Sequence, residues 1–75
     1  MKNEENNIKD ILVKNIKKYR TKHKFTQEKA SDLAGITLKY WQRLEMKSQV
    51  DLPSLKVLFK IAQALEIPVS KLLEE

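Results

Sequence analysis

Apolar residues recur every three or four positions along most of the chain, which is the spacing of a helix with one buried face. The first such stripe consists of Ile8, Ile11, Leu12, Ile16 and Tyr19. It predicts a helix that ends near His23. No segment alternates as a half-buried strand does, so the pattern predicts an all-α chain. Residues 1–7 are polar and aperiodic, which predicts a disordered tail before a domain of residues 8–75.

Three hydroxyl residues mark the starts of later helices. A Ser or Thr at an N-cap accepts a hydrogen bond from the first turn. Thr26, Thr37 and Ser54 each precede an apolar stripe. The stripes predict these inward residues: Ala30, Leu33 and Ala34 in a second helix, and Leu55, Leu58, Ile61, Ala62 and Leu65 in a fourth. Pro68 ends the fourth helix, and residues 69–73 predict a short fifth.

Gly35 is the only glycine in the chain. Glycine enters the left-handed backbone region without a Cβ clash, and helices often end there. With Thr37 capping the next helix just two residues later, Gly35 predicts a tight turn between the second and third helices. Trp41 and Leu44 lie three residues apart and are predicted to face inward from the third helix.

Charge suggests a polyanion as partner. The net charge is +5, and no acid interrupts residues 14–24, where Lys14, Lys17, Lys18, Arg20, Lys22 and Lys24 lie. Nucleic acid binding and an ordinary solvated helix face both fit this block. Apolar runs reach only three residues, which predicts no membrane span. With no cysteine, no metal-ligand cluster and no nucleophile beside a base, we expect no enzyme, cofactor, metal or small-molecule ligand.

Two longer segments carry a family resemblance. The segment TQEKASDLAGITLKYWQRLE, followed by PSLKVLFKIAQALEIPVSKLL, resembles the lambda-repressor-like helix-turn-helix family of the Xre and Cro type. The likeness runs from about Leu12 to Leu73. It implies a compact five-helix domain and a sequence-specific DNA-binding transcriptional regulator, such as a repressor. It also implies a cytoplasmic, nucleoid-associated protein of prokaryotic or phage origin.

The resemblance also implies roles for particular residues. The third helix, about residues 37–46, would enter the major groove of double-stranded DNA. Its base-reading positions correspond to Leu38, Lys39 and Arg43. DNA backbone contacts correspond to Thr26, Gln27, Thr37, Tyr40, Gln42, Lys47 and Ser48. Arg20 and Glu45 would form an ion pair between the first and third helices. The chain would bind a palindromic operator as a homodimer, for which we predict an interface of Leu65, Ile67, Val69, Leu72 and Leu73.

Three departures from the family pattern stand out. Ala30–Ser31 replaces the usual Leu-Ala, and Trp41 replaces Ile or Val, so the indole is predicted to fill the volume left by Ala30. The loop of residues 46–53 is longer than usual.

His23 is predicted to be exposed near the end of the first helix. An alternative function also fits the fold, that of an antitoxin-like protein-interaction module that binds another protein.

Overall fold

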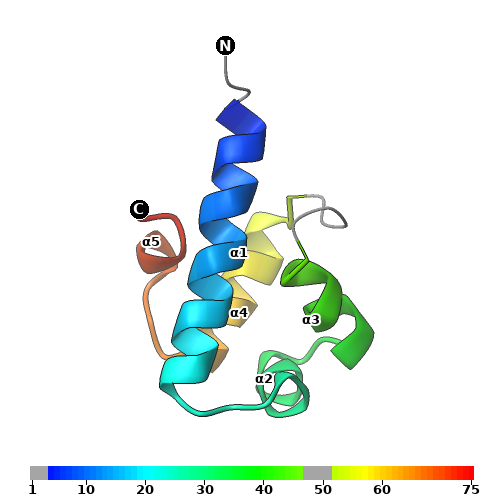
Figure 1. Ribbon diagram of the computed structural model, residues 1–75. Coiled ribbons are helices and arrows are strands. Elements are labelled where there is room, and N and C mark those ends of the chain that lie inside the picture. Colours follow the sequence, from blue (N-terminus) through cyan, green and yellow to red (C-terminus); the bar gives the residue numbers. More distant parts are fainter. Residues whose placement is uncertain (1–3, 47–51) are drawn as a thin grey trace.

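The computed structural model describes residues 4–46 and 52–75, and for residues 4–6 only the backbone. It contains α1 (Glu4–Lys22), α2 (Gln27–Ala34), α3 (Leu38–Leu44), α4 (Leu55–Ala64) and α5 (Val69–Leu72), as Figure 1 shows. None of the described residues lies in a strand. The predicted five-helix, all-α architecture is confirmed.

Helix α1 begins earlier than its apolar stripe indicates. Residues 4–7, assigned to a tail from their polarity, are helical. Once a helix is nucleated, each added residue gains one backbone hydrogen bond, and acids such as Glu4 and Glu5 are favoured in the first turn. Ile8 is 42% exposed, so this extension is not held by core packing. It projects past the other helices in Figure 1.

The N-caps are confirmed. The hydroxyl oxygens of Thr26, Thr37 and Ser54 accept hydrogen bonds from the backbone N–H three residues later, at 3.0, 3.1 and 3.2 Å. Each bond satisfies a donor that has no partner inside its helix. The starts of α2, α3 and α4 are therefore set locally by one side chain each.

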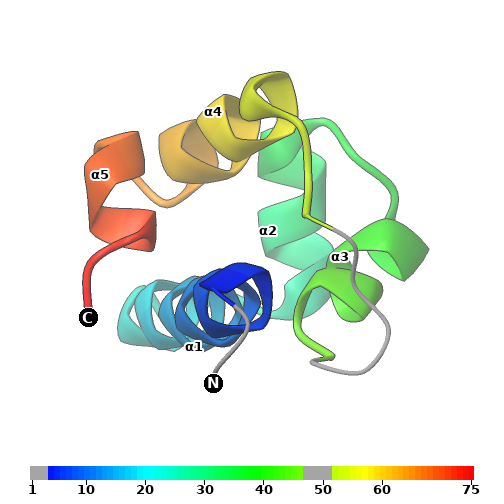
Figure 2. The ribbon, with the colours of Figure 1, turned by 90° about the horizontal axis from the view of Figure 1, so that it is seen from above.

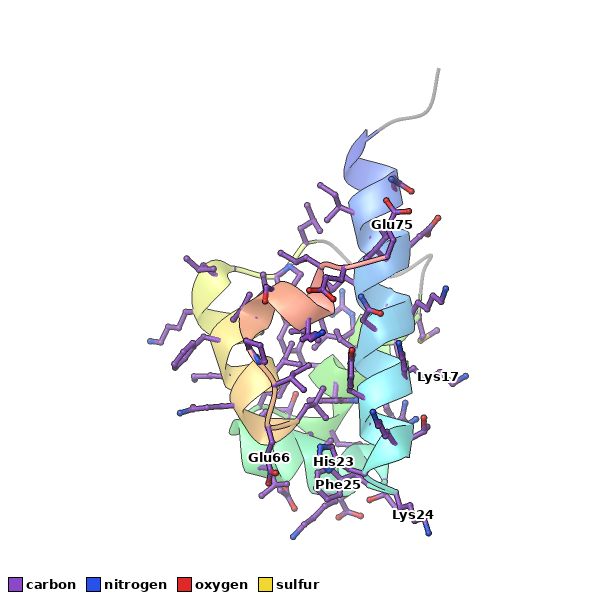
Figure 3. The ribbon with its side chains drawn as sticks, turned by 90° about the vertical axis from the view of Figure 1, so that its left-hand side faces the viewer. Lys17, His23, Lys24, Phe25, Glu66 and Glu75 are labelled. Atoms are coloured by element: carbon purple, nitrogen blue, oxygen red, sulfur yellow. The ribbon has the colours of Figure 1, made fainter. Side chains whose placement is uncertain are left out.

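Three helices end in left-handed turns, whereas glycine content predicts one. Gly35 has a φ of 71°, as expected, but Lys24 after α1 and Glu66 after α4 have φ values of 61° and 59°. Lys24 and Glu66 are labelled in Figure 3. A non-glycine residue in this region carries a backbone penalty, so the hydrogen bonds and packing that follow must compensate for it.

The compensation has the same form at each turn. The residue after the turn donates its backbone N–H to the carbonyl five residues earlier. The three bonds are Phe25 to Arg20 at 3.1 Å, Ile36 to Ser31 at 3.1 Å, and Ile67 to Ala62 at 3.0 Å. Phe25, Ile36 and Ile67 are all partly buried against the core. This pairing of a backbone bond with an apolar contact is the Schellman helix end.

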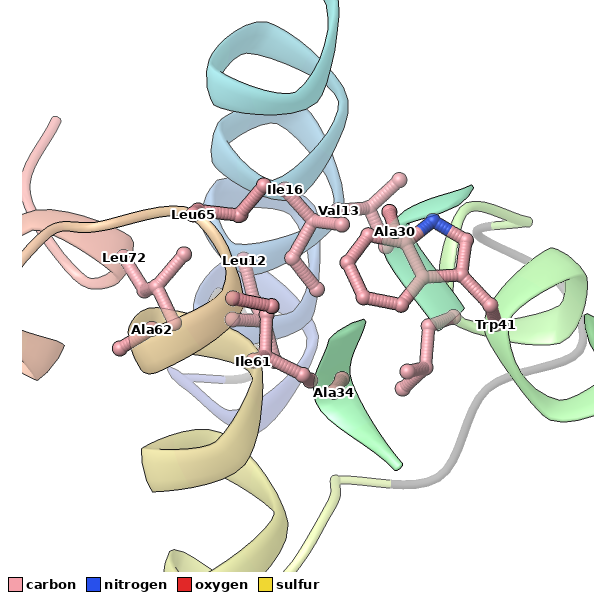
Figure 4. Close-up of a cluster of buried hydrophobic side chains, with 12 residues drawn as sticks. Leu12, Val13, Ile16, Ala30, Ala34, Trp41, Ile61, Ala62, Leu65 and Leu72 are labelled. Carbon is pink, nitrogen blue, oxygen red and sulfur yellow. The ribbon is translucent and has the colours of Figure 1, made fainter. Parts of the chain in front are cut away.

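The core is formed by all five helices (Figure 4). Its fully or nearly fully buried residues are Leu12, Val13, Ile16, Ala30, Ala34, Trp41, Leu44, Ile61, Ala62, Ala64, Leu65 and Leu72. Two predicted inward residues are wrong, because Leu33 is 49% and Leu55 is 74% exposed. Leu33 lies about 100° around α2 from Ala34. Leu55 is the first residue of α4, ahead of the buried positions that begin at Ile61.

Helix α2 contacts both α3 and α4, while α5 contacts α1 and α4. In Figure 2, α2 and α3 therefore lie on one side of the bundle and α5 on the other. Asn15 of α1 holds the C-terminal end in place. Its buried amide Nδ2 donates to the carbonyls of Leu72 at 2.9 Å and Glu74 at 2.7 Å. No helix in the described part of the chain is long and apolar enough to cross a membrane.

Candidate nucleic-acid interface

Helix α3 has one buried face and one exposed polar face. Trp41 and Leu44 are 0% exposed, as predicted. Lys39, Gln42 and Arg43 are exposed, and Leu38 at the start of the helix is 37% exposed. The helix itself contains no acid. Its outer face therefore combines cationic, amide and apolar groups.

The polar groups on this face are not used by the protein itself. Within residues 4–46 and 52–75, no side chain forms a hydrogen bond or ion pair with Lys39, Gln42 or Arg43. Every buried side-chain polar atom in this part of the chain does have a partner. Helix α3 thus presents free donors to solvent, while the buried polar groups of the described residues are hydrogen-bonded.

The predicted ion pair between Arg20 and Glu45 is present, and it joins α1 to the C-terminal end of α3. Arg20 Nε donates to Glu45 Oε2 at 2.6 Å, and Arg20 Nη2 donates to Oε1 at 3.1 Å. The two side chains are only 13% and 5% exposed. A third donor of the same guanidinium, Nη1, bonds the carbonyl of Phe25 at 2.8 Å. Arg20 thereby fixes the end of α3 against α1 and the turn after it.

Two further donors complete the Glu45 cluster, which we define as Glu45 with Arg20, Gln27 and Trp41. Gln27 Nε2 donates to Oε1 at 3.0 Å, and Trp41 Nε1 donates to Oε2 at 2.6 Å. The cluster joins α1, α2 and α3 through one carboxylate. The indole therefore does more than fill volume beside Ala30, because it also supplies a hydrogen bond that Ile or Val could not.

These bonds control the ionisation of Glu45. Burial alone would raise the pKa of this carboxyl. The hydrogen bonds from Arg20, Trp41 and Gln27, together with the positive charge of Arg20, outweigh burial and hold the pKa below its ordinary value of 4.5. The carboxylate at the C-terminal end of α3 is thus ionised, and Arg20 balances its charge.

The predicted backbone-contact residues differ in what they offer to DNA, and Gln42 among them is exposed on α3 as described above. Thr26 and Thr37 use hydroxyl oxygens as caps, which leaves each O–H free to donate. Gln27 commits one N–H of its amide to Glu45 and keeps a second. Tyr40 is half-buried and packs against the core. Lys47 and Ser48, and most of the loop of residues 46–53, lie outside the described residues.

His23 is not the exposed residue that we predicted. Its Nε2 lies 2.7 Å from the carbonyl oxygen of Leu65, and its ring stacks on Phe25 with centroids 4.9 Å apart. Figure 3 shows both rings together at the end of α1. The contact joins residues 42 apart in sequence, so the local pattern around His23 gave no signal of it.

The predicted dimer interface also needs correction. Leu65 and Leu72 are 0% exposed and pack in the core of their own chain. In α5, Leu72 is the buried residue, and the helix contacts α1 and α4. Ile67 and Val69 are partly buried against the core, and Leu73 is 44% exposed. Among the large apolar side chains of the described residues, the most exposed are instead Leu55, with 74%, and Phe59, with 58%.

A comparison with family models places this geometry in context. A helix-turn-helix model, HTH_3, matches residues 16–72. These residues run from the core of α1 to the last residue of α5 and include the α2–α3 turn and the whole Glu45 cluster. No curated protein matches the chain. The function that such a domain suggests is that of a DNA-binding regulator. Since the match spans most of its length, the chain belongs to the helix-turn-helix family, of the lambda-repressor-like type.

Proposed function

We propose that this chain is a sequence-specific transcriptional regulator that inserts residues 37–46 into the DNA major groove. One observation carries the proposal. The exposed face of α3 offers Lys39, Gln42 and Arg43 without an intramolecular partner in the described chain. A recognition helix reads base edges with its outer side chains, while other helices position it. The Glu45 cluster supplies that positioning.

Each base-facing residue has a distinct chemical role. Arg43 offers two parallel donors, which match the O6 and N7 acceptors of guanine. Lys39 donates to the same acceptors with less geometric definition. Leu38 has no donor, and it fits against a thymine methyl group. This set favours a half-site that contains guanine and thymine.

The start of α2 provides the phosphate contact in this proposal. The backbone N–H groups of Gln27 and Glu28 lie at the positive end of the helix. The second amide N–H of Gln27 and the hydroxyls of Thr26 and Thr37 add donors. Tyr40 and Gln42 add polar groups from α3 itself. Contacts of this kind fix the register of a protein on DNA but carry no base preference.

We further propose a homodimer on a palindromic site. One recognition helix covers only a few base pairs, and two-fold pairing would place half-sites about 34–36 Å apart. Leu73, which is 44% exposed, remains the candidate contact at the C-terminal end, together with the partly buried Ile67 and Val69. Leu73→Asp should convert a dimer to monomers in sedimentation. Dissociation by Phe59→Asp, with Leu73→Asp still dimeric, would place the interface on α4 instead.

Selection of bound sequences from random DNA tests the main proposal, with Arg43→Ala and Gln27→Ala as a matched pair. Arg43→Ala should relax preference at one base position per half-site, worth about 1–3 kcal/mol. Gln27→Ala should weaken binding to all sequences equally. Affinity of the wild type should fall steeply with salt as counterions are released. The absence of any enriched sequence would contradict sequence-specific binding.

A second function has one observation in its favour. Leu55 and Phe59 lie one turn apart on α4 and are exposed, and Lys56 beside them is exposed as well. An apolar pair of this kind suits a protein-interaction module, such as an antitoxin-like partner. Salt dependence separates the two functions, because a protein contact through this pair would change little with ionic strength.

A further inference from the structure

We infer that Trp41 is a positioning residue for the phosphate contact of Gln27 and acts through the shared carboxylate of Glu45. The inference rests on the DNA-binding function proposed above. It concerns a side chain that is 0% exposed and touches no DNA itself. Its effect is transmitted by two hydrogen bonds, from Trp41 to Glu45 and from Gln27 to Glu45.

The Glu45 carboxylate has no spare acceptor position. An ionised carboxylate offers about four lone-pair sites. Oε1 accepts from Arg20 Nη2 and Gln27 Nε2, and Oε2 accepts from Arg20 Nε and Trp41 Nε1. All four sites are filled, so the carboxylate plane is fixed. A change at one oxygen must move the other, because the two belong to one rigid group.

Among the four donors, the indole N–H is held most rigidly. Trp41 lies in the core with Val13 and Ala30 nearby in Figure 4, and its ring has only two side-chain torsions. Arg20 and Gln27 have longer, more flexible side chains that are partly exposed. Trp41 and Glu45 are also four residues apart, which brings their side chains to one face of α3. The packing of Trp41 in the core therefore fixes the position of the Glu45 carboxylate through the indole hydrogen bond.

Gln27 receives its orientation from that carboxylate. An amide group has a donor side and an acceptor side, and the Glu45 carboxylate can only accept, so Nε2 must face it. With one N–H bonded to Oε1, the second N–H is fixed at about 120° to the first in the amide plane. No described residue uses this second N–H. It lies at the start of α2, where the helix favours an anion.

Trp41→Phe removes the indole donor and keeps an aromatic ring in the core. We expect it to weaken DNA binding about three- to tenfold at temperatures where the variant is folded, for specific and random DNA alike. Gln27→Ala should weaken binding by about tenfold. In a Gln27→Ala background, Trp41→Phe should have less than about a twofold further effect, because the group it positions is gone.

The outcomes separate the inference from the proposed function. If Gln27→Ala weakens binding and Trp41→Phe does not, the positioning role is wrong and the phosphate contact stands. If Trp41→Phe costs the same factor in both backgrounds, its role is only structural. If Gln27→Ala leaves affinity unchanged, the phosphate contact itself fails.

A measurement on the wild-type chain covers the case in which Trp41→Phe does not fold. Trp41 is the only tryptophan, so its indole N–H gives a single, assignable proton resonance. We expect this resonance to shift when selected DNA binds. The shift should shrink when the phosphate facing Gln27 is replaced by an uncharged methylphosphonate. An indole resonance that does not respond to DNA, or that responds equally to both DNAs, would overturn the inference.

Discussion

Removal of the Arg20 guanidinium is the sharpest test of how α3 is held against α1. Arg20→Met keeps the apolar stem of the side chain and leaves Glu45, whose side chain is 5% exposed, without a cation. Stranding a buried charge costs about 3–5 kcal/mol. The lower end applies here, because Trp41 and Gln27 still donate to the carboxylate. Loss of the bond to the Phe25 carbonyl adds about 1 kcal/mol, for a total of about 4 kcal/mol.

A double-mutant cycle isolates the pair itself. Glu45→Gln should cost about 2–3 kcal/mol, because the amide cannot accept at both oxygen positions. The double variant has no buried charge, so it should be more stable than the two single costs predict by about 2 kcal/mol. Urea unfolding followed by circular dichroism measures all four chains. A domain of this size has only about 4–11 kcal/mol in total, so low temperature is needed to keep Arg20→Met folded.

The chain contains its own control for this cycle. Lys71 and Glu74 form an exposed pair at 3.4 Å, with side chains 47% and 56% exposed. Lys71→Met should change the free energy of unfolding by less than about 0.5 kcal/mol. Coupling between Arg20 and Glu45 within error of zero would refute the reasoning. So would a cost for Arg20→Met no larger than that for Lys71→Met.

Four other changes test separate parts of the fold. The folded pKa of Glu45 lies below its ordinary value of 4.5, so the stability that its ionised form contributes is complete above about pH 5 and is lost as the pH falls through the folded pKa. Urea unfolding at a series of pH values should show this loss of stability. The pH dependence should be absent in Glu45→Gln. Gly35→Ala should cost about 1 kcal/mol from left-handed backbone alone, since its Cβ meets nothing within 4 Å. Glu66→Gly should conversely raise the free energy of unfolding by up to about 1 kcal/mol. If Gly35→Ala and Glu66→Gly changed the free energy of unfolding in the same direction, the backbone explanation would be wrong. Asn15→Ala should cost about 2–3 kcal/mol and expose α5 amides to hydrogen exchange.

Local chemistry made much of the fold predictable. Thr26, Thr37 and Ser54 cap helices by bonds that span three residues, so their roles can be read from adjacent sequence. Trp41 and Leu44 follow from helical spacing alone. The ion pair of Arg20 and Glu45 spans 25 residues and was available only through the family resemblance. The indole bond to Glu45 spans four residues, so spacing could have revealed it.

The errors have a common physical origin. Apolar spacing identifies a stripe but does not say how far along a helix the core extends, so the stripe of α4 includes the exposed Leu55. It also cannot distinguish a residue that packs on its own chain from one that meets a partner, as Leu65 and Leu72 show. The left-handed turns at Lys24 and Glu66 had no glycine to mark them. Those turns are enforced by the apolar residues that follow, whose burial depends on the complete fold.

The bond from Asn15 to the C-terminal carbonyls has a consequence for the order of events during synthesis. Asn15 and the core face of α1 leave the ribosome first, but their partners Leu72 and Glu74 are made 57 and 59 residues later. Until then the part of α1 that packs against α5 is uncovered, and the Asn15 amide lacks these two acceptors. The native packing of α1 can therefore be completed only after residue 74 has emerged from the ribosome.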